Sequence, residues 1–321
     1  MYTPSTTRGT VDSAPADSDG IPTGPQLVAG QVVRPGTDRM IPVPGVMVTL
    51  HRVGSDRAAP LDSTRADARG RYSFHFTRSG DRSAIYFVSA SYGGIAYFTP
   101  PLAHATVKGE EAEIAVFDTT SGPVPISSRG HHVVVSAVDA NGMRNVTEVY
   151  ELANDSSVTR VAGSKNGGEV WSAVLPMQGS GFQVAQGDIP AQAVKFEKGK
   201  ALVLAPIAPG LKQLAFSYSI PASAFPLSIP IVRDTQILEV LIEEEKGSVS
   251  GAKLEETDPV ALERRNFRRF LAADVPANSV SIIDLPAALR NRGIDPRYMI
   301  ALSLVFGAAM IFALARALKR A

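Results

Sequence analysis

Residues 61–76 read LDSTRADARGRYSFHF, and this stretch decides the fold class. From residue 71 onward aromatic and polar side chains alternate, with Tyr72, Phe74 and Phe76 at every second position. Because successive side chains of a strand point to opposite faces, this period of two predicts a half-buried strand. The Asp67-Ala68-Arg69-Gly70 segment before it has the composition of a turn. The stretch therefore predicts a chain built from strands and tight turns.

Runs of the same kind flank this stretch, rich in β-branched and aromatic residues that favour strands. Turn-forming residues separate them at 42–45, 67–70 and 79–81, and strands about ten residues apart are typical of a sandwich. We expect a β-sandwich over residues 26–119. Its candidate strands are LVAGQVV (27–33), VMVTLHRV (46–53), RYSFHF (71–76) and AIYFVSASY (84–92).

Three motifs of this first region resemble the carboxypeptidase regulatory-like, or transthyretin-like, β-sandwich family. They are GQVV (30–33), PVPGVMVTLHR (42–52) and LDSTRADARGRYSF (61–74). The last matches the family's hairpin through Thr64, Asp67, Gly70, Tyr72 and Phe74, with Ala66 before the Asp. The resemblance covers about the first third of the chain. It implies a module without catalysis that acts as a spacer, an adhesion module or an interaction platform.

A segment rich in Ser, Gly and Pro, residues 120–130, reads as a linker to a second β-region over 131–285. Turn signals stand at Asp139–Gly142 and Asn166–Gly168. We expect a second antiparallel sandwich, Ig-like in the loose sense. Its candidate strands are HHVVVSAV (131–138), VTEVYELAN (146–154), EVWSAVLPM (169–177), ALVLAPI (201–207), KQLAFSYSIP (212–221) and QILEVLIEE (236–244).

Residues 258–273 fit two structures. Asp258 followed by Pro259 suits a helix start, and Phe267, Phe270 and Leu271 would then share one helical face. Alternatively, Phe267–Ala273 is a strand and residues 279–285 are its hairpin partner. We favour the strand, because Val275-Pro276-Ala277-Asn278 is a suitable hairpin connection.

The C-terminus carries the longest apolar run, YMIALSLVFGAAMIFALA from Tyr298 to Ala315, which contains no charged residue. As a helix these residues extend roughly 27 Å, close to the hydrocarbon thickness of a bilayer. We expect a transmembrane helix over 298–318, after a juxtamembrane segment at 286–297. Small residues four apart would let it pack on a partner helix, although a helix facing only lipid explains them equally well. These residues are Ser303, Gly307, Ala309 and Ala313.

Composition and motifs argue against several kinds of chemistry. A net charge of +1 argues against nucleic acid as a partner, and the absence of cysteine excludes disulfides and thiolate metal sites. The chain has no Gly-x-Ser-x-Gly, dinucleotide-binding or Walker motif. Adjacent strand residues such as His131 and His132 point to opposite faces and rarely share an ion. We therefore expect no catalytic residue, cofactor or metal.

Basic residues are the remaining candidates for contact with anionic lipid headgroups or an acidic partner, although a solvated surface would explain them too. They are Arg264, Arg265, Arg268 and Arg269, with Arg316, Lys319 and Arg320 after the apolar run. Residues 1–25, rich in Ser, Thr, Pro, Gly and Asp, form an extended arm without the apolar core of a signal peptide. The sequence leaves the export route and the membrane orientation open.

These features predict a mainly β protein with two tandem sandwiches and one C-terminal transmembrane helix. We expect a non-catalytic accessory subunit that stabilises or helps assemble an integral membrane complex, in contact with the lipid bilayer. A photosynthetic reaction centre or another electron-transfer complex is one candidate host. The expected location is a bacterial inner membrane, with a periplasmic body and a cytoplasmic C-terminus. The alternative is an envelope sensor or adhesin that recognises carbohydrate or peptide.

Overall fold

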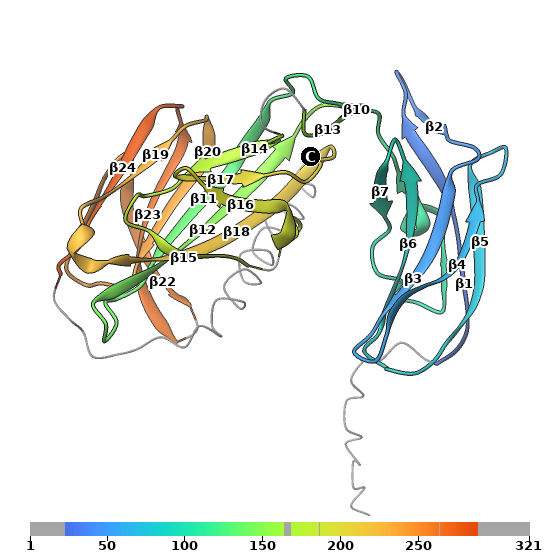
Figure 1. The fold of residues 1–321 in the computed structure, drawn as a ribbon, viewed down its shortest axis with the longest axis horizontal. Coiled ribbons are helices and arrows are strands. Elements are labelled where there is room, and N and C mark those ends of the chain that lie inside the picture. The colour runs from blue at the N-terminus through green and yellow to red at the C-terminus, as the bar shows by residue number, and fades with distance from the viewer. Residues whose placement is uncertain (1–22, 164–167, 186, 263, 288–321) are drawn as a thin grey trace, which may run out of the picture. The chain divides into compact units, whose positions relative to one another are not determined.

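The computed structural model describes residues 23–163, 168–185, 187–262 and 264–287. The chain divides into two compact units at Val116–Phe117, and both are mainly β, as the strand patterns predicted (Figure 1). Within the described residues no helix is long and apolar enough to cross a bilayer. The expected arm and transmembrane helix lie outside the described residues, together with Ser303, Gly307, Ala309, Ala313, Arg316, Lys319 and Arg320.

The first unit contains two sheets. In one, β1 lies between β2 and β5 and also pairs in parallel with β8 and β9; the other has the order β4-β3-β6-β7. Inward side chains such as Val28, Leu50 and Tyr86 are fully buried. The elements are β1 (Gly24–Pro35), β2 (Met40–Pro42), β3 (Met47–Val53), β4 (Ala58–Arg65), β5 (Arg71–Arg78), β6 (Ile85–Tyr92), β7 (Ile95–Phe98), β8 (Thr106–Lys108), the 3₁₀ turn η1 (Gly109–Ala112) and β9 (Ile114–Ala115).

The turn that connects β4 to β5 is stabilised by the side chain of Asp67. Its Oδ1 accepts hydrogen bonds from the backbone N–H groups of Arg69 (2.7 Å) and Arg71 (2.8 Å). Gly70 has φ +71°, and a Cβ there would lie 2.7 Å from the carbonyl oxygen of Val32. The turn was predicted correctly, but the expected hairpin was wrong. The turn packs on β1 and leads the chain from one sheet into the other.

The second unit is built on a seven-stranded sheet, with the order β15-β18-β12-β11-β20-β23-β22. Two three-stranded sheets, β14-β17-β16 and β19-β24-β21, share one hydrophobic core with it. The strands are β10 (Thr119–Thr120), β11 (Ile126–Val135), β12 (Met143–Asn154), β13 (Thr159–Arg160), β14 (Trp171–Val174), β15 (Ser180–Val184), β16 (Val194–Glu197), β17 (Lys200–Val203), β18 (Gly210–Pro221), β19 (Leu227–Ile231), β20 (Thr235–Ile242), β21 (Ser248–Gly251), β22 (Glu255–Leu262), β23 (Arg265–Val275) and β24 (Ser279–Asp284). The 3₁₀ turns are η2 (Ala191–Ala193) and η3 (Ala222–Ala224).

The large sheet is mixed, whereas an antiparallel one was expected. β11 and β20 pair in parallel, with Val133 opposite Val240. A parallel pair needs a long crossover, and here residues 136–234 provide it and contribute strands on the way. Strand β11 also begins at Ile126, inside the expected linker 120–130.

Residues 258–262 belong to strand β22 and residues 265–273 to strand β23, so the helical alternative is wrong. The expected hairpin between this segment and 279–285 is also wrong, because β23 pairs with β20 and β22, whereas β24 pairs with β19 and β21. The connection changes sheets for a local reason. Asn278, with φ +64°, donates its N–H to the carbonyl of Ile231 at 2.7 Å, which directs the chain onto β19.

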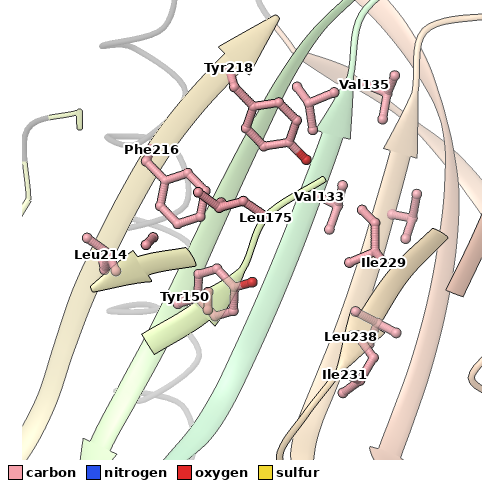
Figure 2. Close-up of a cluster of buried hydrophobic side chains, with 14 of the residues drawn as sticks. Val133, Val135, Tyr150, Leu175, Leu214, Phe216, Tyr218, Ile229, Ile231 and Leu238 are labelled. Carbon is pink, nitrogen blue, oxygen red and sulfur yellow. The ribbon is translucent and has the colours of Figure 1, made fainter. Parts of the chain in front are cut away.

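Alternate residues of the central strands build the core of the second unit (Figure 2). Tyr150 on β12 and Phe216 and Tyr218 on β18 point inward, toward Ile229 and Ile231 of β19. The turn at Asp139–Gly142 joins β11 and β12 as predicted, with the same Asp side-chain hydrogen bonds as at Asp67. The turn expected at Asn166–Gly168 lies mostly outside the described residues.

Candidate binding surfaces

The outward face of the sheet β4-β3-β6-β7 in the first unit carries exposed apolar side chains. Strand register places Val53 opposite Ile85 and His51 opposite Phe87, while Phe98 of β7 pairs beside them. Ile85 is 48% exposed and Phe98 58% exposed. Met47 and Val53 are exposed as well. We call this set, with His51 and Phe87, the β3–β6 patch.

Aromatic contacts give the β3–β6 patch a defined shape. The ring of His51 stacks on Phe87 with centroids 5.0 Å apart, and Phe87 meets Phe98 edge-on at 5.7 Å. His51 Nε2 also lies 2.8 Å from the hydroxyl of Ser89. Burial lowers the pKa of His51, so the ring is uncharged at neutral pH. Rigid aromatic residues around an uncharged ring are typical of protein-binding surfaces.

A second feature of the first unit is an open groove of about 720 Å³ beside the Asp67 turn. Arg65 and Arg71 line one part of it, and Glu110 and Glu113 line another. Because both signs of charge line this groove, its electrostatics favour no single class of ligand.

A polar cluster lies inside the core of the second unit. Glu148 is buried, and its Oε2 accepts hydrogen bonds from His131 Nε2 (2.9 Å) and the Tyr150 hydroxyl (2.7 Å). Its Oε1 accepts one from the Tyr218 hydroxyl (2.9 Å). Burial, with the nearby carboxylate of Glu148, raises the pKa of both tyrosines well above the usual range. They therefore act as hydrogen-bond donors at every physiological pH.

Next to Glu148, an edge of the sheet β14-β17-β16 faces an edge of the sheet β19-β24-β21. β14 and β19 are the terminal strands of their sheets, and residues of both line a pocket of about 400 Å³ with Glu148 at its base. Leu175, Ile229 and Pro230 make the walls apolar, and Met177 stands exposed at the mouth. We call this the β14–β19 pocket.

One end of the gap between β14 and β19 is closed by Arg233. Its Nη1 donates to the carbonyl oxygen of Ser172 on β14 at 2.7 Å, and its guanidinium lies 5.2 Å from the centre of the Trp171 ring. Burial lowers the pKa of Arg233. The open end suits apolar side chains of a partner, since apolar walls with few polar groups are typical of binding pockets.

Three of the arginines proposed for lipid or acidic partners already have carboxylates of this chain. Arg265 is paired with Glu243, and Arg268 holds Glu256 through two hydrogen bonds of 2.7 and 2.8 Å. Arg269 Nε lies 2.6 Å from Glu239. The fourth, Arg264, is exposed between β22 and β23 with φ +66°. The structure thus spreads these four residues over a strand and a turn with different surroundings.

His131 and His132 lie on opposite faces of the large sheet, as strand geometry predicted. Each is bound to a carboxylate, Glu148 for His131 and Glu239 for His132. Among the described residues no group of three or more His, Asp or Glu has the arrangement of a metal site. Glu148 was not among the residues predicted to form a site, although it breaks the apolar alternation of β12 and so marks a buried polar position.

Comparisons with known proteins leave the family open. No family model matches the chain, and a search of curated proteins finds no match. Among solved structures, shaft pilin SpaA from Lactobacillus rhamnosus GG is similar over 43% of this chain and 68% of the pilin, at 12% identity and a TM-score of 0.21. A double mutant of the same pilin gives 11% identity and a TM-score of 0.19. Similarity at this level carries no argument about fold or function.

Proposed function

We propose that this protein is a non-catalytic, membrane-anchored accessory subunit that binds an integral membrane complex through its first unit. The observation that carries the proposal is the β3–β6 patch, where Ile85 and Phe98 are exposed on a flat strand face beside stacked His51 and Phe87. Leaving such side chains in water forgoes about 25 cal/mol per Å² of apolar surface, which docking on a partner recovers. The charge-free run at 298–315 supports the anchor.

The first unit, in this proposal, is a carboxypeptidase regulatory-like module used as an interaction platform. Its Asp67–Gly70 turn and the strand that follows support this assignment. The second unit is an Ig-like spacer between platform and anchor. Holding the first unit at the bilayer raises its effective concentration near a membrane partner, so a modest patch suffices for stable assembly.

Co-purification tests the proposal directly. The tagged full chain is extracted from its native membrane in mild detergent, and proteins present in fixed stoichiometry are identified. We expect integral membrane proteins, and we expect Ile85→Asp with Phe98→Asp to reduce their recovery at least about tenfold, since a buried unpaired charge costs more than 1.4 kcal/mol. Ile41→Asp is the matched control, an exposed apolar residue of the same unit on β2. A monodisperse lone chain would contradict the proposal.

The alternative is an envelope module that binds an apolar peptide segment, and the β14–β19 pocket favours it. In that case Leu175→Asp and Pro230→Asp remove a soluble peptide ligand, whereas the patch variant keeps it. If the protein is a membrane-complex subunit, the pocket variants keep the membrane partners and the patch variant loses them. If it is a peptide-binding module, the pocket variants lose the peptide and the patch variant keeps it.

A further inference from the structure

The large sheet of the second unit has an outer face, opposite to the core. Strand register sets two rows of side chains side by side on this face. One row runs from β20 to β18 through Glu239, His132, Val149 and Ala215, and the other through Leu241, Val134, Thr147 and Ser217. We call these eight residues the outer rows.

Seven residues of the outer rows are buried, all except His132, although several of their side chains are short. Val149 and Ala215 are each 1% exposed, and Ser217 is 2% exposed. Val134 and Leu241 pack against Val260, Leu262 and Phe267 of the neighbouring strands, whereas Val149, Ala215 and Ser217 lie outside that cluster. The described strands outside this sheet cannot shield them either, because β14, β16, β17, β19, β21 and β24 lie on its inner side in the common core. A further segment must cover this face.

The course of the chain indicates which segment is available. Arg144, near the start of β12, donates from Nη2 to the carbonyl oxygen of Pro286 at 2.7 Å. Arg144 has the inward parity of Val146, so the last described residues lie on the core side at the end of the sheet where β12 begins, and residues 288–321 continue from there. An eighteen-residue helix of roughly 27 Å is shorter than β12, whose twelve residues extend about 40 Å. It fits within the length of the sheet.

We propose that the apolar segment 298–315 packs lengthwise on the outer rows whenever it is not in a bilayer. The chemistry of the two surfaces agrees. The segment carries small residues four apart, Ser303 and Gly307 among them, and small residues allow close approach of a helix to a surface that is itself formed by Ala215, Ser217 and Thr147. Separation of the two surfaces would expose apolar area of both to water, so the contact stabilises both.

This inference rests partly on the proposed function, because the same segment is the membrane anchor there. It adds a conformational exchange: before insertion the second unit shields its own anchor, and insertion uncovers the outer rows. A hydrophobic segment sheltered in this way stays soluble until it meets lipid. The uncovered face, with its small and hydroxyl-bearing side chains, then becomes available to a partner.

Cysteine cross-linking tests the contact, since the chain has no cysteine of its own. The full chain is synthesised without membranes or detergent. Ala215→Cys is combined with a single cysteine at Ser303, Gly307, Ala309 or Ala313. The control is Ser228→Cys, an exposed position on β19 at the opposite side of the same unit. Both sets are oxidised mildly, and liposomes are added to a second portion before oxidation.

Docking predicts disulfide from Ala215→Cys to a subset of tail positions three or four residues apart, roughly tenfold above the Ser228→Cys control. Liposomes should reduce this yield and make the Ala215→Cys thiol reactive toward a water-soluble maleimide. Equal yields for both positions without liposomes, with the Ala215→Cys thiol freely alkylated, would overturn the proposal. Flotation of the same samples with liposomes tests the membrane anchor separately from the docking. Chains that float but never cross-link support the anchor and contradict the docking. Chains that cross-link but never float support the docking and contradict the anchor.

Discussion

The ion pairs of His132 predict a specific loss of stability at alkaline pH. The ring lies on the outer face of the large sheet, with Nδ1 2.7 Å from Glu239 Oε2 and Nε2 3.6 Å from Glu151 Oε1. Burial is the largest single influence and by itself lowers the pKa of the imidazole. The hydrogen bonds and charges of Glu151 and Glu239 together outweigh burial and raise the pKa of His132 to about 9.

The magnitude follows from linkage between protonation and folding. In the unfolded chain a histidine has a pKa of about 6.5, so the folded protein binds the proton more tightly by about 2.5 pKa units, equivalent to about 3 kcal/mol. Because the folded state holds the extra proton, this stabilisation is fully present below pH 6.5. It declines as the pH rises from about 6.5 to about 9 and is absent above.

Trp171 provides the assay. It is the only tryptophan of the chain and is buried in the same unit, so its fluorescence reports the unfolding of that unit alone. Urea unfolding of the full chain is measured without detergent from pH 6 to 10. We expect the free energy of unfolding to fall by about 3 kcal/mol in the unaltered protein. His132→Gln should be less stable at pH 6 and have a much flatter profile, whereas the exposed control His75→Gln should follow the unaltered protein. Equal slopes for His132→Gln and the unaltered protein would refute the reasoning.

Two further changes test the turns and the buried cluster. Gly70→Ala should destabilise the first unit by more than about 2 kcal/mol, because it adds a clash with the Val32 carbonyl to the strain of a positive φ. The control Gly142→Ala, with φ +74° but open space around its Cβ, should cost only about 1 kcal/mol. Equal losses of stability by calorimetry would contradict the role of the clash. Tyr218→Phe removes one donor from buried Glu148 and should lower the free energy of unfolding, read by Trp171 fluorescence, by about 1–3 kcal/mol; an unchanged urea midpoint would show that this hydrogen bond contributes nothing.

The strands were predictable because their signal is local. The alternation of aromatic and polar residues is visible within a run such as RYSFHF, and the Asp67 turn is closed by a hydrogen bond within five residues. The sheets were not predictable in the same way. The register of β11 with β20 joins residues about a hundred positions apart, and nothing in either strand specifies a parallel partner. The two wrong hairpins share this cause, since a turn sequence directs the chain sharply but does not say which sheet receives it.

The arginine cluster shows the same limit at the level of sites. Read along the chain, Arg265, Arg268 and Arg269 look like one basic surface. Their carboxylate partners lie 12 to 30 residues away, on β20, on β22 and just after β20. Only the strand pairing brings these charges together, so a basic segment identified before the register is known overstates the charge left for a partner.

Glu148 marks the point where local reasoning could have gone further. Along β12 the inward positions are Val146, Glu148, Tyr150 and Leu152, so a carboxylate interrupts an apolar series. A charged group there is stable only with several hydrogen-bond donors, because burying it unpaired costs far more than one hydrogen bond returns. The sequence supplies a tyrosine two residues on and a histidine at the start of HHVVVSAV, which the register brings onto the same face. An ionisable residue within an apolar period of two therefore predicts a buried polar cluster, and here Glu148 of that cluster lines the β14–β19 pocket.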